Sequence, residues 1–440
     1  TQAGMLITDK NFATEHTSTM QAYHLTLPRH IDASLQLPAS KSLSARALIL
    51  SVLAHNSHVS GLSQCDDTRV LLDALQHRPD EINIGAAGTA MRFLTALLAA
   101  TDSGCHTLTG TPRMQQRPIG LLVEALRSLG ARIDYLGQDG FPPLRIEGGH
   151  MTGGSVGIPA TVSSQYISAL LMVAPILPDG LTLTLEGDVA SMPYIHMTMA
   201  LMAHFGAQPR WADERTIVVP ATGYADCIAY AVEPDWSAAS YWYELVALSP
   251  DPATRIVLKG LTAESLQGDS AIAGLFQSLG VRTTFTDEGA VLTKADAVTR
   301  IKEMNLEDCP DLAQTSVSTC AALHIPFRTT GLHSLKIKET DRIAALQAEW
   351  AKMGVTMGAD GDSLWVEAYS PAAEAAAVAA VPTISTYDDH RMAMAFAPCA
   401  ALVPGLGIAE PAVVSKSYPE YWDHLRHVGA VIDSKEADRA

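Results

Sequence analysis

The 440-residue sequence contains little of what marks a secreted, membrane-bound or metal-binding protein. Its six cysteines show no CxxC spacing, so we expect reduced thiols in a cytoplasmic protein and neither a disulfide framework nor a zinc site. They are Cys65, Cys105, Cys227, Cys309, Cys320 and Cys399. No uncharged run approaches the roughly 18–20 apolar residues that span a bilayer, so we expect no transmembrane segment. Residues 1–20 lack both the apolar core of a secretory signal and the Arg-rich face of a transit peptide, and we expect a disordered leader or non-native extension.

Positive charge is also scarce. Lys and Arg number 30 against 47 Asp and Glu, which gives a formal net charge of −17. This balance argues against nucleic acid and against an anionic membrane as partner. An acidic protein can bind small anions only where its cations are gathered locally, so their positions are informative.

The length and the 48% hydrophobic content indicate two ordinary globular domains.

A repeat is present along most of the chain. Five amphipathic helical segments each end at a glycine that is followed by a short apolar strand pattern, at intervals of 76, 74, 74 and 75 residues. The glycines are Gly130, Gly206, Gly280, Gly354 and Gly429. Glycine after a helix adopts the left-handed conformation without steric cost, so these positions predict helix ends. The segment CDDTRVLLDALQ at 65–76 is a candidate sixth, degenerate copy.

A second, more apolar helical segment alternates with the first. Its copies begin with a small residue or a carboxylate, as in SKSLSARALILSVLA and DDHRMAMAFAPCAL, and we expect them to be buried. The arithmetic predicts an α/β (α+β) protein with six βαβαββ units, three in each of two domains, helices inside and sheets outside. The alternative is a generic α/β fold with unrelated helix endings. In the repeat fold, several helix N-termini would face one cleft and attract anions through their free N–H groups.

Short motifs at these helix starts carry the candidate chemistry. Lys41, Ser42 and Arg46 share the first turns of one helix, so ammonium, hydroxyl and guanidinium can converge on one oxyanion. The Gly-rich turn that ends at Gly88 lets backbone N–H groups approach a phosphate closely. Alternatively, the first motif is a capped helix with solvated charges and the second is a packing site for small residues.

Four further motifs follow the same pattern. Arg117 comes just before a helix that we expect to begin with Pro118 at its first position. The run Ser163–Gln165 can cap a helix or hold a phosphate. The runs Lys338–Arg342 and Asp388–Arg391 mix carboxylates with cations, and ordinary surface ion pairs are the alternative explanation. Lys416 adds a further cation near the C-terminus.

Taken in order from about residue 24 to 430, these motifs resemble those of the 5-enolpyruvylshikimate-3-phosphate synthase family. The fold of that family, an inside-out α/β barrel of two domains with three βαβαββ units each, agrees with the repeat count. By resemblance, residues 41–234 form one domain, and residues 21–38 with 235–440 form the other. The family transfers the enolpyruvyl group of phosphoenolpyruvate to the 5-hydroxyl of shikimate 3-phosphate. The resemblance implies these two small-molecule substrates, no metal and no organic cofactor, and we expect a monomer.

The resemblance also implies roles for single residues. Asp311 would accept the proton of the 5-hydroxyl, and Glu339 would donate a proton to the phosphoenolpyruvate methylene and share this catalytic role with Lys41. The expected shikimate 3-phosphate ligands are Lys41, Ser42, Arg46, Ser163, Ser164, Gln165, Ser191, Tyr194, Asp311 and Lys338. The expected phosphoenolpyruvate ligands are Lys41, Gly88, Arg117, Gln165, Arg342, Arg391 and Lys416.

Three positions depart from the family pattern, since Ala45, Ala86 and Ser334 stand where the family usually has Asn. The nearest rival is the related transferase that uses UDP-N-acetylglucosamine, which begins with a Lys-Asn pair and carries a Cys on the loop before the Arg-Pro helix. Here the pair is Lys41-Ser42 and residues 110–118 contain no Cys. The RNA 3′-phosphate cyclase family and a non-catalytic anion-binding protein of the same fold are the remaining alternatives.

Overall fold

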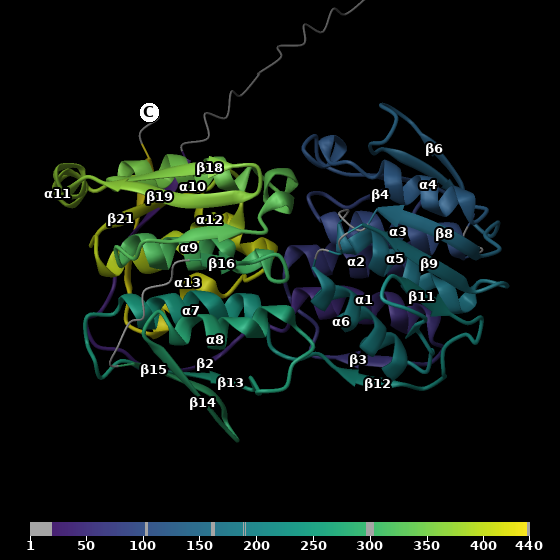
Figure 1. Cartoon of the computed structure of the whole chain (residues 1–440), viewed down its shortest axis with the longest axis horizontal. Coiled ribbons are helices and arrows are strands. Elements are labelled where there is room, and N and C mark those ends of the chain that lie inside the picture. The colour runs from purple at the N-terminus through teal and green to yellow at the C-terminus, as the bar shows by residue number, and fades with distance from the viewer. Residues whose placement is uncertain are drawn as a thin grey trace, which may run out of the picture.

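The structure is a computed structural model that describes residues 20–437 except 102–103, 160–162, 188, 190 and 296–302. It has two lobes side by side (Figure 1), each with its own hydrophobic core. The core of lobe 1 runs from Leu43 to Val219, and the core of lobe 2 combines Leu25–Leu37 with Trp236–Ala430. We propose 41–234 and 21–38 with 235–440 as the corresponding domains. The expected leader, residues 1–20, lies outside the described residues apart from Met20, which begins β1.

Five of the six sheets have four strands in the same arrangement. The first two strands are parallel, and the other two form an antiparallel pair, one strand of which also pairs with the second strand of the sheet. In four of these sheets the antiparallel pair is a hairpin, whereas in the fifth it joins β1 (Met20–Thr26) to β22 (Val431–Ala437), from opposite ends of the described chain. The sheets of lobe 1 consist, in spatial order, of β4 (Glu81–Asn83), β5 (Cys105–Thr109), β7 (Leu144–Glu147) and β6 (Arg132–Tyr135); β8 (Gly154–Pro159), β9 (Leu181–Glu186), β11 (Thr216–Val219) and β10 (Arg210–Trp211); and β12 (Ala229–Ala231) with β3 (His58–Ser60).

The sheets of lobe 2 all have four strands. They consist, in spatial order, of β2 (Asp32–Gln36), β13 (Arg255–Lys259), β15 (Gly289–Lys294) and β14 (Val281–Thr286); β16 (Glu303–Asn305), β17 (Arg328–Thr330), β19 (Ser363–Tyr369) and β18 (Val355–Asp360); and β20 (Thr383–Ile384), β21 (Leu406–Ala409), β1 (Met20–Thr26) and β22 (Val431–Ala437). The predicted fold, with six units and three per lobe, is therefore confirmed.

The sixth unit is incomplete, which explains why its sequence copy is degenerate. Its sheet has only two strands, because α2 (Asp66–His77) leads directly into β4 without an intervening hairpin. Arg78, with φ 42°, replaces the glycine after this helix. The five repeat glycines all have left-handed φ values, between 83° and 102°. The period of about 75 residues thus reflects complete βαβαββ units.

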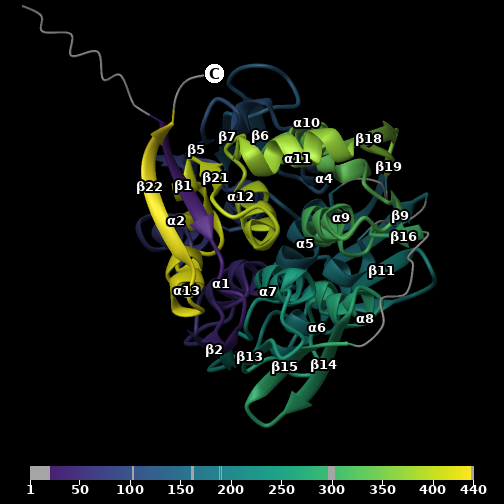
Figure 2. The same ribbon diagram turned by 90° about the vertical axis from the view of Figure 1, so that its left-hand side faces the viewer.

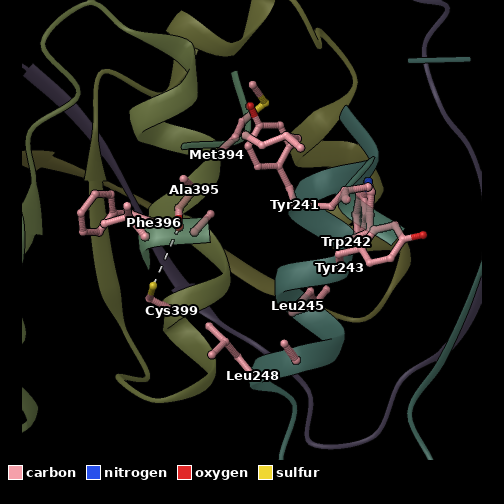
Figure 3. Close-up of a cluster of buried hydrophobic side chains, with 14 of the residues drawn as sticks. Tyr241, Trp242, Tyr243, Leu245, Leu248, Met394, Ala395, Phe396 and Cys399 are labelled. Atoms are coloured by element: carbon pink, nitrogen blue, oxygen red, sulfur yellow. Dashed lines mark hydrogen bonds between the residues drawn. The ribbon is translucent and has the colours of Figure 1, made fainter. Parts of the chain in front are cut away.

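The apolar helices of the repeat form the interior of each lobe, and sheets cover them from outside (Figure 2). Apolar residues occupy almost every side of these helices, so each is stable only when other helices surround it. The inner helices are α1 (Lys41–Leu53), α3 (Gly88–Ala100) and α5 (Ser164–Val173) in lobe 1, and α7 (Trp236–Leu248), α9 (Ala313–Ala322) and α12 (His390–Phe396) in lobe 2. Figure 3 shows Tyr241 and Leu248 of α7 facing Met394 of α12 and Cys399 of the 3₁₀ turn that follows it.

The amphipathic helices alternate with the inner ones along the chain. They are α2, α4 (Gly120–Ser128) and α6 (Met192–His204) in lobe 1, and α8 (Ile272–Gln277), α10 (Arg342–Lys352) and α13 (Tyr421–His427) in lobe 2, with α11 (Pro371–Ala379) as an additional surface helix. The prediction that Pro118 occupies the first position of its helix is wrong, because α4 begins at Gly120 after the cap residue Ile119. No helix in the described part of the chain is long and apolar enough to cross a bilayer.

The chain passes between the lobes twice, and the two passages run side by side. Ala39 forms an antiparallel bridge with Pro234, and Ser40 N–H donates to the carbonyl of Glu233 at 2.9 Å. The Asp235 carboxylate accepts from the N–H of Ala238 at the start of α7 and from the N–H of Lys41 at the start of α1. One carboxylate therefore caps the first helix of both lobes.

Candidate active site

A cavity of about 250 Å³ lies between the lobes and is lined by the starts of their helices. Lobe 1 contributes the first turns of α1, α3, α5 and α6, and lobe 2 contributes those of α10 and α12 with a 3₁₀ turn at Pro310–Leu312. Of the sixteen residues that the sequence nominates for the site, all but Lys416 line this cavity. The expectation that helix N-termini of both lobes face one cleft is confirmed.

Two carboxylates of lobe 2 are held by two buried guanidinium groups. Asp311 accepts from Arg342 Nη1 at 3.2 Å and from Arg391 Nη2 at 2.8 Å. Glu339 accepts from Arg342 Nη2 at 3.2 Å and forms an ion pair with Lys416 at 3.3 Å. Asp389, fully buried, binds Arg342 through Nε at 2.7 Å and Nη2 at 3.3 Å. Arg342 is therefore the centre of three ion pairs, and its orientation is fully determined by them.

These cations control the charge of both carboxylates. Burial alone raises the pKa of Asp311, but the charges of Arg391, Lys338 and Arg342 outweigh it and hold that pKa far below the ordinary value. Burial likewise raises the pKa of Glu339, and Lys416 and Arg342 hold it well below its usual range. Both groups are therefore ionised at neutral pH. In this state Asp311 is a weak proton acceptor, and Glu339 carries no proton that it could donate.

The cations of lobe 1 line the same cavity as these two carboxylates of lobe 2. Lys41 Nζ pairs with Asp67 Oδ2 at 3.1 Å. Burial lowers the pKa of Lys41, yet the negative charges of Asp67 and its neighbours outweigh burial and leave it above the ordinary value. Arg46 donates to Thr198 at 2.7 Å, to Ser168 at 3.0 Å and to the carbonyl of Ser42. Arg46 thus orders the packing of three helices as well as lining the cavity.

Gly88 has no side chain, and this leaves room for the guanidinium group of Arg117. A Cβ atom on Gly88 would lie 2.6 Å from Arg117 Nη1, which is closer than van der Waals contact permits. The guanidinium of Arg117 therefore lies directly over the first residue of α3. Arg92, one turn further along α3, donates to the carbonyls of Gly88 and Pro118 and holds the two segments together.

The hydroxyl groups of lobe 1 gather at the starts of α5 and α6. Ser163 caps α5 by accepting from Gln165 N–H, and the Gln165 amide donates to Thr89 at 3.1 Å. Ser191 is left-handed, with φ 56°, and precedes α6. Its hydroxyl donates to the carbonyl of Glu307 in lobe 2 at 3.2 Å.

The lobes touch each other around the cavity. Tyr194 of lobe 1 approaches Asp311 at 3.5 Å. Arg113 donates from Nε and Nη2 to the carbonyls of Glu339 and Lys338, both at 3.2 Å. Lys416 of lobe 2 donates to the carbonyl of Ala86 at 2.7 Å and lies 3.7 Å from Asp67. The ion pairs of Lys416 with Asp67 and Glu339 explain why it borders the cavity without lining it.

Sequence reasoning missed several residues at this site. Asp67, Arg92 and His390 line the cavity, and Arg113 reaches the Lys338–Glu339 segment. Burial, followed by the charges of Lys41 and Arg391, holds the pKa of His390 well below its usual value, so the ring is neutral. Asp67 could have been found, because it lies in the first turn of α2, the degenerate copy of the repeat. Of the three departures from the family pattern, Ser334 lines the cavity and Ala86 contributes only its carbonyl.

Two three-unit lobes that enclose a cavity of cations, helix N-termini and two ionised carboxylates define a two-lobed enzyme acting on small anionic substrates. Residues 76–425 match the family model of EPSP synthase (3-phosphoshikimate 1-carboxyvinyltransferase). The chain belongs to this family.

Relatives with that activity in their name are similar over nearly the whole chain. A 3-phosphoshikimate 1-carboxyvinyltransferase of Bacteroides fragilis is 52% identical over 408 residues, covering 92% of this chain and 98% of the relative. One of Bordetella petrii is 38% identical, covering 91% and 96%. The solved EPSP synthase of Acinetobacter baumannii has the same fold, with a TM-score of 0.74 at 20% identity over 95% of this chain and 100% of that one.

Proposed function

We propose that this protein transfers the enolpyruvyl group of phosphoenolpyruvate to the 5-hydroxyl of shikimate 3-phosphate and releases phosphate. The observation that carries the proposal is the pair of ionised carboxylates, Asp311 and Glu339, each bound to cations that can also bind substrate anions. Transferases that share 52% and 38% identity with almost the whole chain support it.

In this proposal each substrate occupies a different part of the cavity. Hydroxyl and amide groups at the start of α5, together with Ser191 and Tyr194, bind the shikimate phosphate. Lys41, Ser42, Arg46 and Lys338 bind the rest of that substrate. The cations on both sides of the cleft bind the phosphate and carboxylate of phosphoenolpyruvate, namely Lys41, Arg117, Arg342, Arg391 and Lys416, with Gln165 and the backbone of Gly88.

Substrate binding changes the state of the two carboxylates. The anionic groups of phosphoenolpyruvate compete for the same guanidinium and ammonium groups that now hold Asp311 and Glu339. Added negative charge beside Glu339 raises its pKa, so this group takes up a proton when the substrate arrives. Losing part of its contact with Arg391 makes Asp311 a stronger base.

The reaction then follows from these two groups. Glu339 donates its proton to the methylene carbon of phosphoenolpyruvate, which makes C2 electrophilic. The 5-hydroxyl oxygen bonds to C2 while Asp311 takes its proton, and the fixed cations stabilise the tetrahedral adduct. Phosphate then leaves from C2, and a proton returns from the methyl group to Glu339 as the double bond reforms. Contact between the lobes excludes water during these steps.

We expect the protein to release inorganic phosphate from phosphoenolpyruvate when shikimate 3-phosphate is present. A colorimetric phosphate assay with either shikimate 3-phosphate or UDP-N-acetylglucosamine as acceptor tests this. Absence of release with shikimate 3-phosphate contradicts the proposal, and release only with the sugar nucleotide assigns the protein to the sister reaction. Absence of release with both acceptors favours a non-catalytic anion-binding protein.

Gly88→Ala is expected to raise the KM for phosphoenolpyruvate about tenfold or more, with a smaller change for shikimate 3-phosphate. The added methyl group would lie 2.6 Å from Arg117 Nη1, so the guanidinium must move away from its place over α3. Steady-state kinetics with each substrate varied in turn measures this. Gly274→Ala is a suitable control, because nothing lies within 4 Å of its added methyl group. An unchanged KM for phosphoenolpyruvate in Gly88→Ala contradicts the role given to Arg117.

Location and assembly are also part of the proposal. All six cysteines are free thiols, and four of them, Cys65, Cys309, Cys320 and Cys399, are buried, which is typical of proteins from reducing compartments. We propose a cytoplasmic protein on this basis. We also propose a monomer, because one chain supplies both carboxylates and every nominated cation except Lys416 to the lining of the cavity.

A further inference from the structure

The turn just before α12 has an unfavourable backbone conformation. Asp389 N–H donates to the carbonyl of Thr386 at 2.9 Å, which closes a four-residue turn. Both central residues, Tyr387 and Asp388, have φ of 55°. Positive φ at both central positions is the mark of a type I′ turn, which normally requires Asn-Gly or Gly-Gly. A tyrosine followed by an aspartate therefore adopts this turn only if surrounding contacts impose it.

Those contacts come from Glu349, two turns beyond Arg342 on α10. Its side chain is fully buried, and its Oε1 accepts from the Tyr387 hydroxyl at 2.6 Å. Its Oε2 accepts from Ser385 N–H at 3.0 Å and from Lys352 Nζ at 2.6 Å. Lys352 also donates to the carbonyl of Thr383 at 3.1 Å. The carboxylate thus binds the turn through the residue before it and through its first left-handed residue.

Two residues that contribute to the site follow the turn directly in the sequence. Asp389 follows it, caps α12 through Arg391 N–H at 2.9 Å and binds Arg342. Arg391 comes next and binds Asp311 and Tyr241. Two contacts therefore link α10 to the turn. The first is the ion pair of Arg342 with Asp389 at the start of the helix, and the second is the hydrogen bond of Glu349 with Tyr387 two turns further along. A change in the turn displaces both guanidinium groups relative to the cavity.

We propose that Glu349 and Tyr387 are positioning residues for phosphoenolpyruvate binding. They hold the left-handed turn that places Arg391 and the Arg342–Asp389 pair at the cavity. Neither residue lines the cavity, so they act only through the turn. The inference rests on the proposed function, because it assigns these two guanidinium groups to phosphoenolpyruvate.

Tyr387→Phe is the direct test, since it removes one hydroxyl from a side chain that is 38% exposed and leaves the fold intact. We expect the KM for phosphoenolpyruvate to rise about tenfold and the KM for shikimate 3-phosphate to change less than about twofold. Glu349→Gln is expected to raise the KM for phosphoenolpyruvate at least as much. Tyr224→Phe is the matched control, because it removes a similar 2.6 Å hydrogen bond, to the carbonyl of Met172 in lobe 1. It should leave both KM values unchanged.

Replacing Asp388, the second left-handed residue of the turn, with glycine should partly restore the phosphoenolpyruvate affinity lost in Tyr387→Phe. The Asp388 side chain is exposed and does not line the cavity, and glycine adopts a φ of 55° without strain. Asp388→Gly alone should leave both KM values unchanged, and the double variant Tyr387→Phe/Asp388→Gly should recover at least half of the lost affinity. A purely structural role predicts a lower Tm in Tyr387→Phe with unchanged KM values, and that result overturns the proposal. An equal rise in both KM values also overturns it.

Wild-type turnover separates this inference from the proposed function. If the wild-type protein does not release phosphate, the proposed function fails. The positioning role is then tested by calorimetric titration of wild-type and Tyr387→Phe proteins with inorganic phosphate, which binds the same guanidinium groups. A Kd about tenfold higher in the variant supports the role, and an equal Kd rejects it.

Discussion

Asp311→Asn is expected to lower kcat by about 10²–10⁴-fold while both substrates still bind. The carboxylate lies between Arg342 and Arg391, with Tyr194 at 3.5 Å, and those contacts keep it ionised and oriented. Asparagine has nearly the same shape, and its single carbonyl oxygen can still accept a hydrogen bond from one of the two guanidinium groups, but it cannot take a proton from the 5-hydroxyl. The loss should therefore fall on the chemical step.

Steady-state kinetics together with calorimetric binding of shikimate 3-phosphate measures the two parts of this prediction. Asp308→Asn is the control, because Asp308 is exposed, three residues away and outside the cavity lining. A kcat for Asp311→Asn within about tenfold of the wild-type value would show that another group accepts the proton. Loss of shikimate 3-phosphate binding would show instead that Asp311 acts mainly as a ligand.

Glu339→Gln is expected to reduce kcat by a similar factor of about 10²–10⁴, for the opposite reason. Glutamine has no proton to give to the methylene carbon. Phosphoenolpyruvate binding should be unchanged or tighter, because the substitution removes a negative charge that competes for Arg342 and Lys416. Glu264→Gln is the control, because it makes the same replacement of a carboxylate by an amide on an exposed loop.

Proton uptake tests the same residue independently of turnover. The pKa of Glu339 is well below its ordinary value in the protein alone. In the proposed mechanism this pKa rises when phosphoenolpyruvate shares the same cations. A group whose pKa rises on binding takes up a proton at any pH between the two values. Calorimetry in buffers of different ionisation enthalpy should therefore give a proton uptake up to one larger for the wild type than for Glu339→Gln. Equal uptake by the two proteins contradicts the role of Glu339 as proton donor.

Much of this architecture is readable from the sequence because it depends on local conformation. The repeat glycines mark helix ends through their left-handed φ, and the small or acidic residues at 40, 163, 235 and 389 cap helices within the next three residues. Both effects act over a few residues of backbone. They therefore determine the number of repeat units, and they place nearly all the nominated residues at the starts of helices.

Contacts between distant segments were decided only by the tertiary structure. Lys416 binds Asp67 and the carbonyl of Ala86 in the other lobe, and Arg113 reaches the carbonyls before Arg342. Neither partner in such a pair carries a local signal for the other. The left-handed turn at Tyr387 runs against its own sequence, and the contacts that bind it come from distant segments, among them the buried carboxylate of Glu349.

The sequence by itself therefore determined where the positive charge of this acidic protein gathers, because helix starts are set by short-range sterics and hydrogen bonds. Tertiary structure decided which charges meet. Arg342 has three carboxylates and Asp311 two guanidinium groups because packed helices bring residues 311, 342, 389 and 391 together. Interactions between charges depend on distance and burial, and both are properties of the packed lobes rather than of any one segment.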